Sequence, residues 1–294
     1  MLPAFELLTP STVTEAIRMK LETGGKFIAG GTDILVAMHN GKERYATLID
    51  LKGIAELNYF ETEQGLCIGA LTPHRTLELN SIVRERYTAL FEGCSQVGSS
   101  QIRVRGTVGG NICNAVPSAD SIGPLLVFNA LCVIAGKDGE RTIPLAEFFT
   151  GVKKTVLGEG ELLKGVLVPE PAAGSGSAYT KYTRRRAMDL ALFGVSCYTG
   201  MDGNVMKTVR IALTTAAPTP MRATDAEAFL AGKTPGDDEL REAAELVARQ
   251  AKPRSSWRSS ASVLSSVSGI VASPRPAPLR ACAHDCTHGS SRRQ

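Results

Sequence analysis

Apolar residues recur at helical spacing through residues 13–21, a pattern that predicts an amphipathic helix. Strand-sized apolar segments follow at 26–29 and 47–51, and a short apolar segment between them, 34–38, is predicted to be helical. A strand, a short helix and a second strand in this order form a βαβ-like unit, whose two strands run parallel. The beginning of the chain is therefore expected to hold a small parallel sheet.

The rest of the chain up to residue 252 predicts a mixture of strands and helices. The predicted strands are residues 66–70, 131–135, 141–145, 179–184, 190–199 and 205–214, and the predicted helices are 82–91, 122–130, 224–231 and 237–250. The glycine-flanked turn at 136–139 joins two of these strands as a hairpin. The last three strands, followed by two helices, predict an α+β domain with a three-stranded antiparallel sheet.

Changes in composition divide the chain into domains. A stretch rich in Pro, Gly and Ser at 171–177 is typical of a linker, and residues 253–294 contain 11 serines and few large apolar side chains. We expect an α+β domain at 178–252 after this linker. The family resemblance described below implies that the part before it consists of two subdomains, at 1–60 and 61–173. The tail at 253–294 is expected to be disordered.

Charge also differs between the body and the tail. The tail carries six arginines and a single acidic residue, whereas residues 1–252 carry 27 basic and 28 acidic residues, so the formal charge of +4 comes from the tail. A body without net positive charge has no general electrostatic attraction to nucleic acid. No apolar run approaches 18 residues, which argues against a membrane span. Seven scattered cysteines and an N-terminus unlike a signal peptide favour a cytoplasmic protein.

Motifs for metal binding and for acid–base catalysis are weak. The body has only two histidines, His39 and His74, and neither G-x-S-x-G nor H-E-x-x-H occurs. Two cysteines and two histidines at 282–288 have the chemistry of zinc ligands, but structural zinc sites need a folded frame. We therefore expect no metal site and no catalytic residue in this chain.

Two glycine turns carry the most informative chemistry. The first is F-I-A-G-G-T-D at 27–33, where a strand meets a short helix, and the second is T-V-G-G-N at 107–111. Glycine lets a ligand approach the backbone, and unpaired amides at the start of a helix attract phosphate groups. A single Gly-Gly turn is usually only a turn, but two of them with flanking Thr and Asp or Asn favour a dinucleotide site.

The first turn, together with R-G-T-V-G-G-N-I-C-N-A-V-P-S-A-D-S-I-G-P at 105–124, resembles the FAD-binding subunit of molybdenum hydroxylases. This is the family of xanthine dehydrogenase, aldehyde oxidase and carbon monoxide dehydrogenase, and the resemblance extends over residues 1–252. It implies a two-subdomain FAD-binding domain of the vanillyl-alcohol-oxidase-like type, with a small parallel part and a larger mixed or antiparallel sheet.

The resemblance also implies the cofactor-binding residues. The FAD pyrophosphate would be wrapped by Phe27, Ile28, Ala29, Gly30, Gly31, Thr32, Asp33 and Ile34, and the second phosphate and ribityl loop would be Thr107, Val108, Gly109, Gly110 and Asn111. Asp120, Lys181 and either Leu163 or Lys164 match family positions near the flavin. The alternatives are that Asp120 is a helix cap and that Lys181 is a solvated lysine on a strand.

The function implied by the resemblance is electron transfer. FAD in this chain would receive electrons from the [2Fe-2S] clusters of a small partner subunit, while a large molybdopterin subunit hydroxylates the substrate. The final acceptor would be NAD or another acceptor. A stand-alone flavin-dependent reductase or oxidase, and a non-catalytic assembly protein with the same fold, are the alternatives.

The tail departs from the family pattern. Residues 253–260 begin as the last domain of the family does, but the acidic amphipathic helix expected after them is absent from the sequence. The tail is therefore either a natural divergence or the product of a frameshift. Some members of the family, of the 4-hydroxybenzoyl-CoA reductase type, carry a cysteine-rich insertion for a four-iron cluster. This insertion is absent from the sequence, so we expect no iron–sulfur cluster on this chain.

Overall fold

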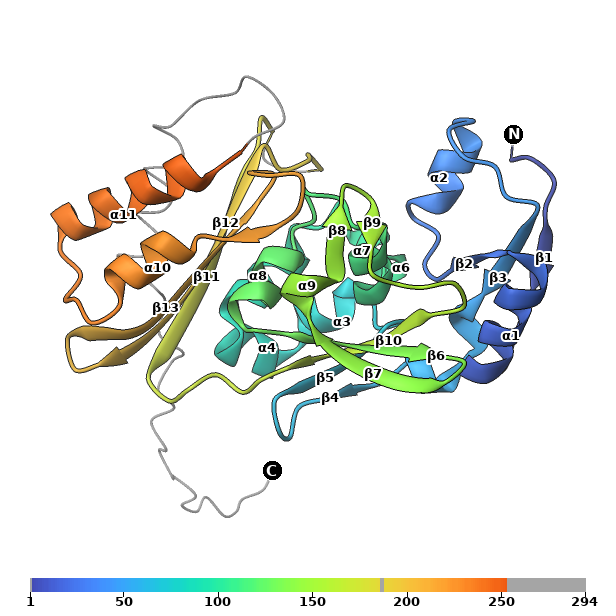
Figure 1. Ribbon diagram of the computed structural model, residues 1–294, viewed down its shortest axis with the longest axis horizontal. Helices are drawn as coiled ribbons and strands as arrows, with labels where there is room; N and C mark the ends of the chain where they lie inside the picture. The colour runs from blue at the N-terminus through green and yellow to red at the C-terminus, as the bar shows by residue number, and fades with distance from the viewer. Residues whose placement is uncertain (1, 186–187, 253–294) are drawn as a thin grey trace, which may run out of the picture.

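The computed structural model describes residues 2–185 and 188–252. Three main sheets succeed one another along the long axis of the molecule, with the N-terminal sheet at one end and the C-terminal domain at the other (Figure 1). The predictions for the tail, including its disorder and its four Cys and His residues, concern residues outside this described part.

The first sheet is parallel, as the apolar pattern predicts. Its strands are β1 (Glu6–Leu8), β2 (Lys26–Ile28) and β3 (Thr47–Asp50), in the order β1-β3-β2. Helix α1 (Val13–Thr23) connects the first two strands, and α2 (Ile34–His39) follows the first glycine turn. Strand β1 has no counterpart in the sequence prediction, because it is only three residues long and two of them are exposed.

The second sheet is antiparallel and has the order β4-β5-β10-β6-β7. Its strands are β4 (Phe60–Glu61), β5 (Leu66–Gly69), β6 (Leu131–Gly136), β7 (Gly139–Pro144) and β10 (Leu162–Val168). The predicted hairpin between β6 and β7 is confirmed. Because β4 begins at Phe60, this sheet starts just before the predicted boundary at residue 61.

Short helices pack on the second sheet and enclose the largest core. They are α3 (His74–Leu79), α4 (Ser81–Arg86), α5 (Thr88–Ser95), α6 (Ser100–Arg105), α7 (Val108–Asn114), α8 (Ile122–Val127) and α9 (Leu145–Phe148). The prediction of one helix over 82–91 is wrong, because Tyr87 leaves helical geometry and separates α4 from α5. The Tyr87 side chain is buried in this core, so packing decides the break.

The remaining short elements connect the first two sheets or lie beside the second sheet. They are the 3-10 helices η1 (Leu51–Gly53) and η2 (Ala55–Leu57) and the two-stranded sheet of β8 (Phe149–Gly151) and β9 (Lys154–Thr155). All lie before the linker-like stretch at 171–177. The second sheet, with its helices and these short elements, is called the second part of the molecule below.

The third sheet has four strands, one more than predicted. Strands β11 (Ser175–Tyr182), β12 (Phe193–Asp202) and β13 (Val205–Thr214) are the predicted antiparallel strands, and the two-residue β14 (Met221–Arg222) joins the edge. Helices α10 (Thr224–Leu230) and α11 (Asp237–Gln250) share an apolar core with this sheet. Their bounds agree closely with the prediction.

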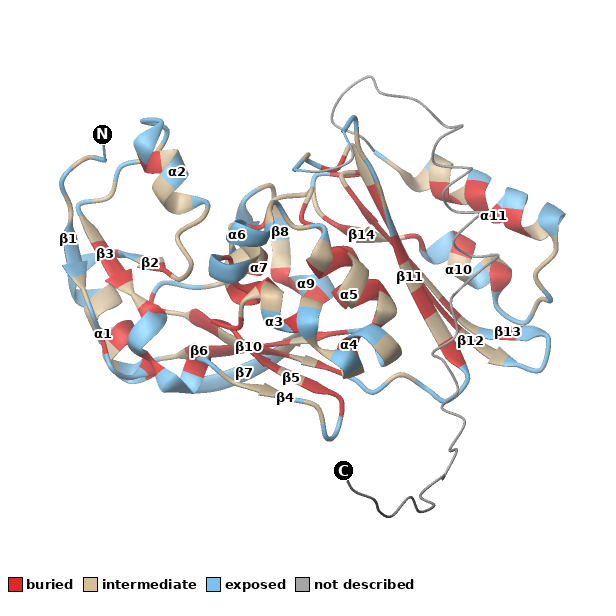
Figure 2. Ribbon diagram, turned by 180° about the vertical axis from the view of Figure 1, so that it is seen from behind, coloured by how far each residue is buried: buried red, intermediate tan, exposed pale blue. Residues whose placement is uncertain are grey.

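The other side of the third sheet faces the second part of the molecule, where α5 lies alongside β11 (Figure 2). Tyr179 and Tyr198 of the third sheet belong to the large core. Arg210 donates to the Val127 carbonyl at 2.7 Å and Arg222 donates to the Leu126 carbonyl at 3.3 Å. Arg210 thus supplies a donor to the Val127 carbonyl at the C-terminal end of α8. Arg222 adds a donor to the Leu126 carbonyl, which also accepts from Asn129 N–H at 3.0 Å.

Candidate functional site

The first glycine turn offers a row of unpaired backbone donors. Among the described residues, the N–H groups of Gly30, Gly31, Thr32 and Asp33 donate to no other group of the protein. Gly31 has φ of +77°, a conformation that glycine adopts without the steric cost of a side chain. The turn therefore fits an anionic group such as a pyrophosphate, as the prediction for unpaired amides requires.

The second glycine turn has similar residue types, but its backbone N–H groups from Val108 to Asn111 already donate within the protein. Val108 N–H donates to Thr72 O at 2.9 Å and Gly109 N–H donates to Ala70 O at 3.0 Å. The Thr107 hydroxyl caps α7 by accepting from Gly110 N–H at 3.0 Å. Asn111 N–H donates to the Thr107 carbonyl. The prediction that this turn also presents unpaired amides is therefore wrong.

The two turns lie against each other, although they are far apart in the sequence. A side chain at Gly30 would collide with the carbonyl oxygen of Arg105, directly before the second turn. A Cβ atom at Gly106 would lie 3.4 Å from the hydroxyl oxygen of Thr32. The first turn thus packs directly against the residues that lead into the second turn.

Asp33 introduces an acidic group at the first turn. Burial raises the pKa of its carboxyl, while Lys153 and hydrogen bonds with Asn114 and Thr32 act in the opposite direction. Because a carboxylate repels phosphate, Asp33 is better suited to hold the turn in place than to contact the anion through its side chain.

Asp120 does not cap a helix. Residue Ser121 precedes α8 instead, and no side chain caps this helix. The Asp120 carboxylate accepts hydrogen bonds from the Tyr179 hydroxyl at 2.6 Å and from Lys181 Nζ at 2.8 Å. Burial raises the pKa of Asp120, and the hydrogen bonds from these two residues oppose the increase. Ser121 also donates to Asn111 Oδ1 at 2.8 Å, which connects this region to the second turn.

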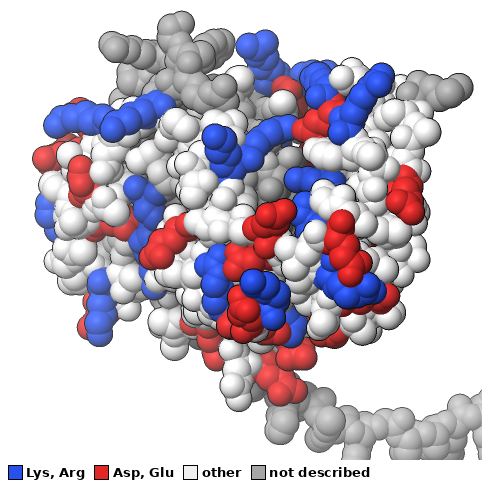
Figure 3. Space-filling model, turned by 45° about the vertical axis from the view of Figure 1, so that its right-hand side comes forward, with Lys and Arg blue, Asp and Glu red and all other residues white. Residues whose placement is uncertain are grey.

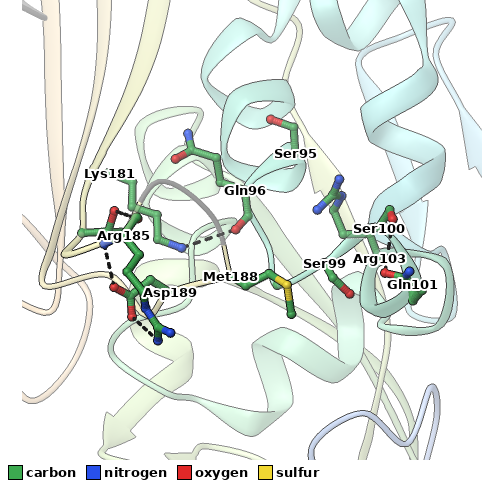
Figure 4. Close-up of a pocket in the computed structure, with 12 residues that line it drawn as sticks. Ser95, Gln96, Ser99, Ser100, Gln101, Arg103, Lys181, Arg185, Met188 and Asp189 are labelled. Carbon is green, nitrogen blue, oxygen red and sulfur yellow. Dashed lines mark hydrogen bonds and ion pairs between the residues drawn. The ribbon is translucent and has the colours of Figure 1, made fainter.

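Lys181 is not a solvated lysine, since only 6% of its side chain is exposed. It lines a cavity of about 430 Å³ whose walls come from the region before and within α6 and from the loop after β11 (Figure 4). Its main lining residues include Gln96, Ser99, Arg103, Lys181, Arg185 and Asp189. A cavity of this size falls within the range of ligand pockets, roughly 300–1,000 Å³.

Leu163 does not line this cavity, but its backbone forms a hydrogen bond with the Cys113 side chain of α7, the helix that begins at the second glycine turn. It is a buried residue of β10, paired in register with Ile134, and so belongs to the large core. The alternative residue Lys164 forms an ion pair with Glu140 at 2.6 Å on the partly exposed side of the sheet. The segment 95–103, which forms one wall of the cavity, was not singled out by the sequence, because a short polar stretch carries no motif.

Charge at the surface is mixed. The face shown in Figure 3 carries basic and acidic side chains side by side, without a field of one sign. The described part of the chain contains no cluster of three or more residues suited to a metal ion and no helix that is long and apolar enough to span a membrane.

Comparison with known proteins places this geometry in a family. Residues 3–171 match the FAD binding domain in molybdopterin dehydrogenase, and residues 177–264 match the CO dehydrogenase flavoprotein C-terminal domain. The chain belongs to this family of FAD-binding subunits. The FAD-binding domain and its C-terminal companion thus account for the three sheets, and the resemblance noted in the sequence is confirmed.

Relatives from several bacteria are similar over most of the chain. The xanthine dehydrogenase FAD-binding subunit of Escherichia coli O157:H7 is 35% identical over 85% of this chain and 87% of the relative. The carbon monoxide dehydrogenase medium chain of Hydrogenophaga pseudoflava is 33% identical over 91% of this chain and 94% of the relative.

Solved structures give the same result for the fold. A chain of the carbon monoxide dehydrogenase from Hydrogenophaga pseudoflava that lacks the Mo-pyranopterin moiety matches with a TM-score of 0.88 and 32% identity. This match covers 93% of this chain and 98% of that chain. Quinoline 2-oxidoreductase from Pseudomonas putida 86 matches with a TM-score of 0.83 and 28% identity, over 92% of this chain and 95% of that chain.

Proposed function

We propose that the chain is the FAD-binding electron-transfer subunit of a multi-subunit molybdenum hydroxylase. The row of unpaired amides at Gly30–Asp33 is the observation that carries the proposal, because it fits the pyrophosphate of a dinucleotide. The family of FAD-binding domains to which the chain belongs supports the choice of FAD over other dinucleotides.

The chain's own residues would bind and orient the cofactor. Within the segment Phe27–Ile34, the amides would hold the pyrophosphate and the Thr32 hydroxyl would add a donor. The segment Thr107–Asn111 would contribute the Thr107 and Asn111 side chains, since the amides of residues 108–111 are used within the protein. Asp120, Lys181 and, more remotely, Leu163 complete the proposed site.

FAD, when bound, supplies the redox chemistry, because it can exchange electrons singly or in pairs. The protein contributes no proton transfer of its own in this account. Lys181 places a positive charge at the wall of the cavity, and burial of this charge makes its field stronger than it would be in water. In this account the chain binds FAD and sets the electrostatic potential around it.

The proposed electron path needs partner subunits. Electrons would come from the [2Fe-2S] clusters of a small subunit, and the molybdopterin centre would lie on a large subunit. NAD or another acceptor would receive the electrons in the cytoplasm. The proposal is supported by relatives named as a medium chain and as an FAD-binding subunit, which are names of components of larger enzymes.

Affinity purification of the tagged full-length chain from its own host tests this function. We expect a yellow complex that contains one FAD per copy of this chain and two further subunits, one with molybdenum and one with iron. A lone monomer that turns over a substrate would show the stand-alone enzyme instead. A colourless chain that does not take up added FAD would show an assembly protein.

A further inference from the structure

The Asp120 carboxylate connects two parts of the protein. It lies between α7 and α8, with 8% of its side chain exposed, and both residues that donate to it belong to β11 of the third sheet. Tyr179 binds one carboxylate oxygen at 2.6 Å and Lys181 binds the other at 2.8 Å. A buried carboxylate with two such partners fixes the position of both side chains.

Lys181 is held at two of its three N–H groups. One hydrogen bond goes to Asp120, and a second goes to the Gln96 carbonyl at 3.3 Å. The ammonium group therefore has one donor left. Lys181 lines the cavity, whereas Asp120 is not among the lining residues, and Figure 4 shows the lysine reaching across to Gln96 at this wall.

We propose that Asp120 is a positioning residue, which fixes the Lys181 ammonium so that its remaining N–H faces an acceptor atom of the bound flavin. This inference rests on the proposed function. Asp120 acts on the flavin through Lys181, because its own oxygen atoms are directed to Tyr179 and Lys181. Without the carboxylate, a long and flexible lysine side chain turns towards solvent instead of remaining buried without a counter-ion.

The direction in which Asp120→Asn changes the flavin reduction potential distinguishes a positioning role from a direct effect of the Asp120 charge on the flavin. A positive charge near the flavin stabilises its more negative, reduced form and raises the reduction potential. If Asp120 acted on the flavin directly, its replacement by Asn would remove a negative charge and raise the potential. If Asp120 positions Lys181, the same replacement withdraws the ammonium and lowers the potential.

The test compares Asp120→Asn, Lys181→Met and the double variant in the FAD-loaded full-length chain. We expect both single variants to lower the flavin potential, and we expect the double variant to match Lys181→Met, since Asp120 then has no ammonium to position. Tyr179→Phe, which removes one donor to Asp120 and keeps the ring, is expected to give a smaller decrease. A raised or unchanged potential in Asp120→Asn, or additive effects in the double variant, would overturn the proposal.

Acylation of lysine side chains, followed by peptide mass spectrometry, gives a readout that does not need FAD. In the wild type, Lys181 is expected to react more slowly than the exposed Lys137 of the β6–β7 turn. In Asp120→Asn, Lys181 is expected to react at a rate similar to that of Lys137. Continued protection of Lys181 in Asp120→Asn would refute the positioning role. A wild-type chain that protects Lys181 but binds no FAD would instead refute the proposed function.

Arg210→Met is the matched control. Arg210 also crosses to the second part of the molecule, through its hydrogen bond to the Val127 carbonyl, but it does not line the cavity. We expect this variant to weaken the packing of the third sheet while the flavin potential and the protection of Lys181 stay at wild-type values. Changes equal to those of Asp120→Asn would show that domain packing, and not positioning, is responsible.

Discussion

The two glycine turns have nearly the same residue types but different roles in the structure. The first, at Gly30–Asp33, presents backbone N–H groups that no group of the described residues accepts, whereas the N–H groups of residues 108–111 are all bonded within the protein. The acceptors for the second turn include the Ala70 and Thr72 carbonyls, which come from a distant segment. A glycine turn is thus a binding site only where tertiary contacts leave its amides free.

Packing at the second turn gives the largest expected effect. A methyl group at Gly109 would lie 2.6 Å from the Ala70 Cβ atom and 2.7 Å from its backbone, so the backbone must shift. We expect Gly109→Ala to lower the free energy of unfolding by about 1–3 kcal/mol, as overpacking does. Urea denaturation measures this. Gly200→Ala is the control, because the new atom would meet Thr208 only at 3.5 Å or more. Equal stability of the two variants would contradict the close packing of Gly109 against Ala70.

Strain at the first turn gives the next effect, and this effect is on binding. Alanine at the Gly31 φ of +77° costs about 1–2 kcal/mol, and relief of this strain turns the amides away from the pyrophosphate. We expect Gly31→Ala to weaken FAD binding about tenfold, which corresponds to about 1.4 kcal/mol. Titration of the apoprotein with FAD, followed by flavin fluorescence, measures the affinity.

Gly24→Ala is a matched control for strain. Gly24 ends α1 at a φ of +66° and has open space around its Cβ position. Its replacement should cost similar stability and leave FAD affinity unchanged. If both variants lost the same affinity, general destabilisation would explain the result and the first turn would not be the site.

Loss of the cap on the second turn gives the smallest expected effect. Thr107→Val removes the hydroxyl that accepts from Gly110 N–H and should lower stability by about 1 kcal/mol. Thr12→Val removes the equivalent cap of α1, where the hydroxyl accepts from Glu15 N–H. Thermal unfolding should show similar losses for the two variants. If Thr107→Val lowered FAD affinity more than Gly31→Ala did, the second turn, and not the first, would be the more important for FAD binding.

Local patterns predicted much of the fold. The parallel strands β2 and β3, the β6–β7 hairpin and the helices α10 and α11 follow from periodicity and turn residues that lie within short segments. The break at Tyr87 was not predictable, because the burial of this ring depends on core residues from other elements. A short exposed strand such as β1 likewise carries no pattern of its own.

The candidate site was predictable only in part. The residues of the first turn, Asp120 and Lys181 could be named from motifs and from the family resemblance. Their physical states could not, because the state of each depends on distant partners. Sequence alone left two alternatives, a helix cap for Asp120 and a solvated lysine for Lys181. The structure shows instead a buried ion pair between Asp120 and Lys181. The use of the second turn's amides depends in the same way on carbonyls from another segment.

Hydrogen–deuterium exchange of the full-length chain, with and without FAD, tests the central claim most directly. Without FAD, amides of the first turn at 30–33 should exchange rapidly, while those at 108–111, which are hydrogen-bonded, should exchange slowly. FAD should strongly slow exchange at the first turn and change it little at the second. Unchanged exchange at the first turn in the presence of bound FAD would contradict the account.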